Sequence, residues 1–350
     1  MAVYINAAES ISPLETFQAG EFMAFPGNPG KPYFSCINPD YRQFINPSAL
    51  RRMSKVIRMG LTASKVCLES AGISEPGAIV IGSGLGCVQD TAKFLNQVID
   101  NREQLLNPTA FIQSTHNTVS GQIALMLGCR EYNLTFTQKT ISFETALLDA
   151  LLLVDEGVDN ILLGGVDEVV DESHELMVRS GCVKPRFEEG LLESHGPGAV
   201  AGEGAVFFVL SGTANQGTLV RIDDLEIIHR CNGFRDLQGR MGAFLQRNGL
   251  SVGDVDLLVT GRNGDARYSD LYRGVEHLFS GSLIAGYKHL VGEYDTASAF
   301  GTYLAARVIR DQHVPPVALL NGVERDRINR APVFNYSKDR DFTFTLLSGL

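Results

Sequence analysis

Short apolar runs alternate with longer amphipathic segments along most of the chain, which is the pattern of an α/β fold. Residues 48–71 predict a long helix, because Met53, Ile57, Leu61, Ser64 and Leu68 recur at three- and four-residue spacing and Gly72 follows as a stop. Other runs predict further elements: strands at 3–6, 78–81, 134–137, 160–163, 205–210, 219–228, 257–260, 283–286 and 317–320, and helices at 117–127, about 141–155, 237–249 and 296–310.

Two of these successions are alike. A strand, a helix and a strand occupy 134–163, and the same order returns at 283–320. Each succession predicts a parallel unit whose crossover is the helix. We therefore expect an internal duplication, with halves at 1–212 and 213–350 that pack as layers.

Composition narrows the class of protein. The chain has 350 residues, of which 44% are hydrophobic and 20% charged, as in an ordinary globular protein. Its net charge of −10 argues against a nucleic-acid partner. The longest apolar stretch, 146–154, is interrupted by Asp149, and residues 1–8 lack the features of an export signal, so we expect no membrane span and a cytoplasmic location.

The cysteines do not form a recognisable framework. Six of them lie far apart without a CxxC pair or metal-ligand spacing, which predicts neither a disulfide scaffold nor a metal site. The GSGLG loop at 82–86 lacks the last glycine and the acidic partner of a dinucleotide site, so a tight turn is the simpler interpretation. We expect no cofactor.

Six segments together carry a resemblance to a known family. The most specific is GAVAGEGA at 198–205, and the apolar strand 206–210 follows it. In order and spacing the segments resemble the β-ketoacyl-acyl carrier protein synthases of the thiolase-like superfamily: 48–73, 81–87, 133–168, 197–210, 254–270 and 288–301.

The resemblance implies a thiolase-like fold, a five-layered α-β-α-β-α stack of two duplicated halves, and a dimer. The strand at 134–138 would then pair across the dimer axis, and the helix at 117–127 would lie beside the partner's acyl tunnel. The residues expected at the tunnel or the dimer interface are His116, Asn117, Phe136 and Phe143.

The family's catalytic cysteine is missing from this chain. An active enzyme places it at a helix N-terminus, where the thiolate is favoured. Counting back along the helix from Asp149 and Ala150 puts this position at Thr140, with Gln138 as the alternative if the loop slips by two residues.

The two catalytic histidines are missing as well. Asp270 matches the aspartate after the first one, which places that histidine at Arg262, or at Gly261 or Asn263 if the loop shifts. For the second, Lys288 matches a retained lysine and Glu293 stands at the histidine position. A carboxylate there would repel a malonyl anion.

These departures predict a ketosynthase-like subunit that does not condense, similar to a chain length factor. The glycine-rich gating loop is also replaced, by NYSKDR at 335–340. The partner would be an active ketosynthase, or a second copy of the chain, together with an acyl carrier protein and an acyl chain. Residues 111–125 resemble short subunits from aryl polyene or flexirubin-type pigment clusters.

Two alternatives stay open. The chain is an active noncanonical 3-oxoacyl synthase if another group, such as His195 or His289, replaces the lost ones. It is a homodimeric scaffold if it binds a carrier protein without catalysis. The net charge of −10 disfavours docking of an acidic carrier protein on this chain, which points to docking by a basic partner subunit.

Overall fold

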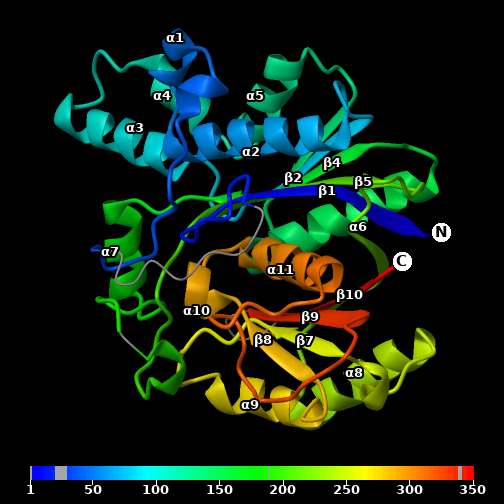
Figure 1. The fold of residues 1–350 in the computed structure, drawn as a ribbon. Helices are drawn as coiled ribbons and strands as arrows, with labels where there is room; N and C mark the ends of the chain where they lie inside the picture. The colour runs from blue at the N-terminus through cyan, green and yellow to red at the C-terminus, as the bar shows by residue number, and fades with distance from the viewer. Residues whose placement is uncertain (1, 20–29, 189, 338–340) are drawn as a thin grey trace.

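A computed structural model describes residues 2–19, 30–188, 190–337 and 341–350. Figure 1 shows helices on the outside, a sheet, a middle layer of two helices, a second sheet, and more helices on the opposite outside. The predicted five-layer stack is thus confirmed. None of the helices among the described residues is both long and apolar enough to cross a bilayer.

The two sheets of the stack are the two halves of one continuous sheet, in which the strand order is β3-β2-β4-β5-β1-β6-β10-β9-β7-β8. Their bounds are β1 (Val3–Ile11), β2 (Ala78–Gly82), β3 (Tyr132–Phe136), β4 (Ile161–Asp167), β5 (Gly204–Ser211), β6 (Val220–His229), β7 (Leu257–Thr260), β8 (Leu283–Gly286), β9 (Arg330–Ser337) and β10 (Asp341–Ser348). The two halves join through a short antiparallel contact between β1 and β6.

The helices lie on both faces of each half-sheet. Figure 1 places α2, α3 and α5 outside the first half, α8 and α9 outside the second, and α6 and α11 between them. Their bounds are α1 (Pro47–Leu50), α2 (Lys55–Ala71), α3 (Val88–Asp100), α4 (Pro108–Gln113), α5 (Thr118–Leu127), α6 (Ser142–Asp155), α7 (Asp171–Arg179), α8 (Phe234–Arg247), α9 (Ser269–Leu278), α10 (Lys288–Val291) and α11 (Ala297–Asp311).

The duplication is visible in the strand pairing. In the first half β2 pairs in parallel with β3 and β4, and β5 lies antiparallel between β4 and β1. In the second half β7 pairs in parallel with β8 and β9, and β10 lies antiparallel between β9 and β6. The same topology occurs twice, although a domain boundary at 212/213 stays a prediction.

The strand predicted at 317–320 is wrong. This segment contributes only an isolated bridge between Leu319 and Ala285, and the strand that completes the second parallel unit is β9 at 330–337. The apolar run at 317–320 reflects burial of single residues such as Ala318 rather than a place in the sheet.

The long helix predicted at 48–71 is interrupted. Asn46 caps the short α1, and α2 begins only after Ser54, whose extended backbone (φ −66°, ψ 168°) breaks the helix. The predicted end is confirmed, because Gly72 adopts the left-handed conformation (φ 71°) that lets the chain leave α2. Helices α4, α7 and α9 and strands β9 and β10 were not predicted.

Packing of the middle layer requires small residues. Every residue of α11 from Ala297 to Ile309 is buried. A Cβ atom at Gly165 of β4 would lie 2.8 Å from the Cβ of Ala299 and 3.2 Å from Phe143 on α6. Backbone of the first sheet and both middle helices therefore approach one another at this glycine.

We expect Gly165→Ala to lower the free energy of unfolding by about 1–3 kcal/mol, because the added methyl group overpacks the middle layer. Gly239→Ala in α8 is the matched control: a Cβ there meets nothing within 4 Å. That variant should be neutral or more stable, since alanine favours a helix over glycine. Urea unfolding measures the free energy of unfolding of both variants. Equal changes in the two would contradict the packing argument.

Candidate functional site

Thr140 lies at the start of the first middle helix. Strand β3 ends at Phe136, a single 3₁₀ turn follows at 139–141, and α6 begins at Ser142. Lys139 has a left-handed φ of 54°, which makes this turn tight. Thr140 is 5% exposed, whereas Gln138 is exposed. Only Thr140 of these two positions faces the interior.

Side chains from the second half close over the start of α6. The amide of Asn335 donates to the carbonyl oxygen of Thr140 (3.4 Å) and to Oε1 of Glu144 (3.1 Å). The hydroxyl of Thr343 donates to the same Glu144 oxygen (2.8 Å), and the hydroxyl of Tyr287 donates to Oδ1 of Asn335 (3.3 Å). Residues of β9 and β10 therefore hold the start of α6, the helix that follows β3.

A second buried cluster contains the retained lysine. Lys288 and Glu293 form an ion pair of 2.9 Å, and Asn263 donates to the other Glu293 oxygen at 2.7 Å. Lys288 is 2% exposed and Glu293 5%. The chain brings Glu293 here through Gly292 (φ 83°). Both carboxylate oxygens are thus occupied by partners within this chain.

The three residues predicted as alternatives for the first histidine position make different contacts. Asn263 contacts Glu293, whereas Nε of Arg262 lies 3.3 Å from Oε1 of Glu276 on α9. A Cβ at Gly261 would lie 2.8 Å from the hydroxyl of Tyr287 and 3.3 Å from Cε of Lys288. Asn263 is therefore the loop residue that meets the second cluster, and Tyr287 connects it with the first.

Four of the six cysteines have thiols that burial makes harder to ionise. Burial raises the pKa of Cys36, Cys67, Cys87 and Cys231 above that of an ordinary cysteine. An activated nucleophile needs the opposite shift. No group of three or more metal-ligating side chains that could hold an ion occurs among the described residues.

The two histidines considered as replacements lie apart from these clusters. His195 is exposed. His289 is buried, its Nε2 contacts the carbonyl oxygen of Val317 (3.0 Å), and burial lowers its pKa to about 4. Within the described part of the chain, neither has a hydrogen bond to the residues around Thr140 or Glu293.

The residues predicted for a tunnel or an interface divide into two groups. His116 and Asn117 are exposed just before α5, and Phe136 is half-buried at the end of β3. Phe143 is completely buried, with its ring 5.8 Å from that of Phe208, so it packs in the core of this chain. Their roles toward an acyl chain or a partner stay predictions.

Sequence reasoning missed four residues of the first cluster: Glu144, Tyr287, Asn335 and Thr343. Glu144 had a signal, because it is an acidic residue on the apolar face of α6, one turn after Thr140. The sequence predicts Asn335 to be part of a replaced gating loop at 335–340. It lies instead in β9, and 338–340 are outside the described residues.

We expect Lys288→Met to lower the free energy of unfolding by about 3–5 kcal/mol, because it leaves the carboxylate of Glu293 buried without its cation. The double variant Lys288→Met/Glu293→Gln should recover most of this loss, since no uncompensated charge remains and Asn263 keeps an acceptor. Chemical denaturation of the single and double variants measures the coupling. Additive losses would show that the pair is not coupled.

Glu144 should make stability depend on pH. Burial raises its pKa above 4.5, and hydrogen bonds from Thr343 and Asn335 oppose this only in part. The folded state therefore favours the neutral carboxyl of Glu144. Its contribution to the free energy of unfolding is fully present below the pKa of Glu144 in the unfolded chain and is lost as the pH rises through its pKa in the folded chain. Glu144→Gln removes the titration, so the variant should gain stability relative to wild type between about pH 5 and about pH 8.

The control for this comparison is Glu75→Gln, the same change of charge at an exposed position. Unfolding free energies measured by urea titration at both pH values give the readout. A constant difference between Glu144→Gln and wild type across this range would contradict a raised pKa.

The comparisons with known proteins agree with this geometry. Residues 30–188 match the family model "Beta-ketoacyl synthase, N-terminal domain". No curated protein sequence matches the chain significantly.

Three solved structures share the fold over the whole chain. The ishigamide ketosynthase/chain length factor has a TM-score of 0.80 at 16% identity and covers 100% of this chain and 99% of its own. A type II polyketide synthase acyl-carrier protein in complex with its ketosynthase gives 0.76 at 14% identity, with coverage of 100% and 99%. A ketosynthase in complex with its chain length factor from Xenorhabdus doucetiae gives 0.75 at 13% identity, with coverage of 100% and 98%.

At identities this low, the structural similarity establishes the fold alone, and the activity has to be inferred from the residues of the site. Residues 30–188 thus match the β-ketoacyl synthase N-terminal domain, and the whole chain has the fold of the solved ketosynthases and chain length factors.

Proposed function

We propose that this chain is a non-condensing subunit that pairs with an active ketosynthase and shapes the tunnel for the growing acyl chain. The observation that carries the proposal is the state of Glu293. This residue stands where a family enzyme has its second histidine, and Lys288 and Asn263 hold it in a buried ion pair and hydrogen bond. An imidazole donor is replaced by a neutralised carboxylate.

The nucleophile position supports the same conclusion. A threonine hydroxyl attacks a thioester only when a base within hydrogen-bond reach takes its proton. In Glu144, one turn further along α6, one carboxylate oxygen accepts from Asn335 and Thr343, and the other makes no hydrogen bond of normal geometry with a described residue. This carboxyl is the base that the alternative, an active noncanonical synthase, would need. A malonyl anion would also meet the carboxylate of Glu293 instead of a neutral donor.

The partner would bind at the free edge of β3. This strand ends the sheet, and Tyr132 and Leu134 on it are 42% and 40% exposed. Leu125 on α5 and Leu152 on α6 add apolar surface at 75% and 55% exposure. An unpaired edge beside exposed leucines favours strand pairing with another subunit. Structural neighbours that are ketosynthase and chain length factor complexes support this arrangement.

The substrate would be an acyl chain of fatty acid or polyketide synthesis delivered by an acyl carrier protein. The similarity of 111–125 to subunits of pigment clusters makes an aryl polyene or flexirubin-type chain our proposal.

The decisive experiment combines this chain with an active ketosynthase encoded beside it. We expect the purified chain to show only background condensation of an acyl thioester with malonyl-carrier protein, and no acyl adduct by mass spectrometry. Thr140→Ala should leave the activity and product length of the pair unchanged. Condensation by the chain alone that is lost in Thr140→Ala would establish an active noncanonical synthase instead.

Pairing is tested at the strand edge by Leu134→Glu, which places a charge in the proposed interface. The matched control is Leu176→Glu on α7, a leucine that is 67% exposed outside this surface. We expect co-purification and product length to change only with Leu134→Glu. A stable homodimer that ignores the ketosynthase would support the scaffold alternative.

A further inference from the structure

A small polar cavity lies in the second half, where β6 and β9 begin and β10 ends. Its volume is about 260 Å³. The strands contribute Arg221, Arg330 and Ser348 to its lining, and Leu250 enters from the segment after α8. None of the described lining residues belongs to the clusters around Thr140 or Glu293, so the cavity is separate from the candidate site.

The register of the strands places three polar residues of the lining in one row. Ser348 of β10 lies directly opposite Arg221 of β6 on one side and opposite Arg330 of β9 on the other. Directly opposed residues of antiparallel strands point to the same face of the sheet, with Cβ atoms about 4.5–5.5 Å apart. A serine hydroxyl therefore lies between two arginine side chains.

Arg330 contributes a cation that lacks a directly bound counter-ion. It is half-buried, and its guanidinium makes no ion pair or hydrogen bond within the described part of the chain. The carboxylate of Asp254 interacts with Arg330 only at longer range, because it is exposed and accepts its hydrogen bonds from Ser251. Arg221 differs, since its Nε is paired with Asp223. The row therefore has a surplus of one positive charge.

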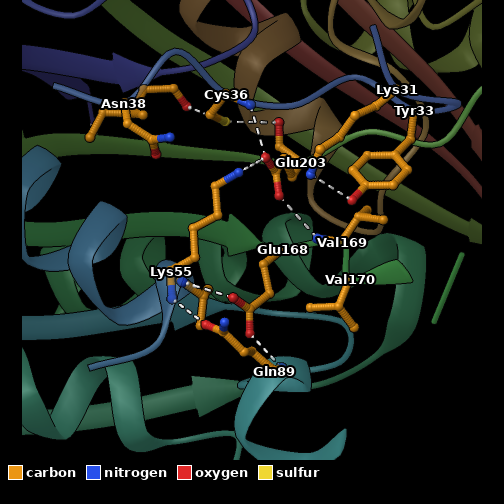
Figure 2. Close-up of polar contacts among 12 residues, drawn as sticks. Lys31, Tyr33, Cys36, Asn38, Lys55, Gln89, Glu168, Val169, Val170 and Glu203 are labelled. Atoms are coloured by element: carbon orange, nitrogen blue, oxygen red, sulfur yellow. Dashed lines mark hydrogen bonds and ion pairs between the residues drawn. The ribbon is translucent and has the colours of Figure 1, made fainter. Parts of the chain in front are cut away.

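Ser348 contributes a buried hydroxyl without a partner. The residue is 4% exposed, and its Oγ makes no hydrogen bond in the described structure. Figure 2 shows the usual situation at the start of α2, where each carboxylate oxygen of the buried Glu168 and Glu203 accepts from a backbone N–H group. Buried polar atoms rarely lack partners, so an unpartnered hydroxyl beside an unpaired guanidinium indicates a ligand between them.

We propose that this cavity binds a small organic carboxylate. One carboxylate matches the surplus charge of the row, the guanidinium of Arg330 holds it through two parallel hydrogen bonds, and the hydroxyl of Ser348 donates a third. The side chains of Leu250 and Leu346 in the lining provide an apolar wall for a short aliphatic part. The volume lies below the range of roughly 300–1,000 Å³ that is typical of sites for drug-sized ligands, which favours a small molecule.

Saturation-transfer difference NMR with butyrate, at constant ionic strength set by chloride, tests the proposal. We expect a saturable signal with a dissociation constant in the millimolar range. Arg330→Gln should weaken binding by about tenfold or more, because it removes the charged donor. Acetate lacks most of the apolar part and should bind more weakly than butyrate. Inorganic phosphate should also bind more weakly, because a dianion exceeds the surplus charge of the row.

Two further variants separate a specific site from net charge. Ser348→Ala keeps the charge and should weaken butyrate binding several-fold, while it leaves the free energy of unfolding unchanged or raised, because the hydroxyl has no partner in the free protein. Arg235→Gln removes an exposed arginine at the opposite end of α8 and should bind as the wild type does. Circular dichroism establishes that each variant is folded.

The proposal is overturned if the butyrate signal does not saturate, or if Arg235→Gln weakens binding as much as Arg330→Gln does. Tighter binding of phosphate than of butyrate overturns the carboxylate as the ligand class. Ser348→Ala that lowers stability and leaves butyrate binding unchanged assigns the hydroxyl a structural role and equally overturns the proposal. These outcomes do not depend on whether the chain condenses acyl groups or pairs with a ketosynthase.

Discussion

The structure depends on two helices that share a single layer between two halves of a sheet. Both faces of this layer must be apolar or internally paired, and the backbones must come close. Gly82 shows how close, because a Cβ atom there would lie 2.6 Å from the backbone of Ser142 at the start of α6. The approach is equally close at Gly301 on α11, where a Cβ would lie 2.8 Å from the ring of Tyr287. Bulkier residues at these contacts would separate the layers.

The same constraint places the candidate site. Helices α6 and α11 follow β3 and β8 at equivalent places in the two halves, so their starts point to one region. Polar residues that enter this region are taken out of water and need partners. Glu293 has Lys288 and Asn263, whereas Glu144 has Asn335 and Thr343 on one oxygen and no hydrogen bond of normal geometry with a described residue on the other. Pairing across the halves ties the site to the stability of the whole stack.

The sequence predicted much of the layering because strands such as β7 and β8 are short, buried and uniformly apolar. Through the family resemblance it singled out Lys288, Glu293 and, as one of three alternatives, Asn263, but their mutual contacts were not predicted. It failed at β9 and β10, although residues 341–346 of β10 alternate polar and apolar, and at 317–320, which looks like a strand but lies outside the ladder. The roles of Asn335 and Thr343 follow from strand pairing that no local pattern encodes.

The fold and the catalytic activity of a protein depend on different numbers of residues, so one can be kept without the other. The fold is specified by many apolar and small positions that act together, so it survives at 16% identity to a solved ketosynthase/chain length factor. Catalysis depends on single groups, and a charged group that is buried at a site must find a partner. Glu293 with Lys288 and Asn263 is such a solution, in which both carboxylate oxygens have partners and the charge is matched. Removing either partner would leave a buried charge or acceptor uncompensated, and under the proposed function the condensation falls to the partner subunit.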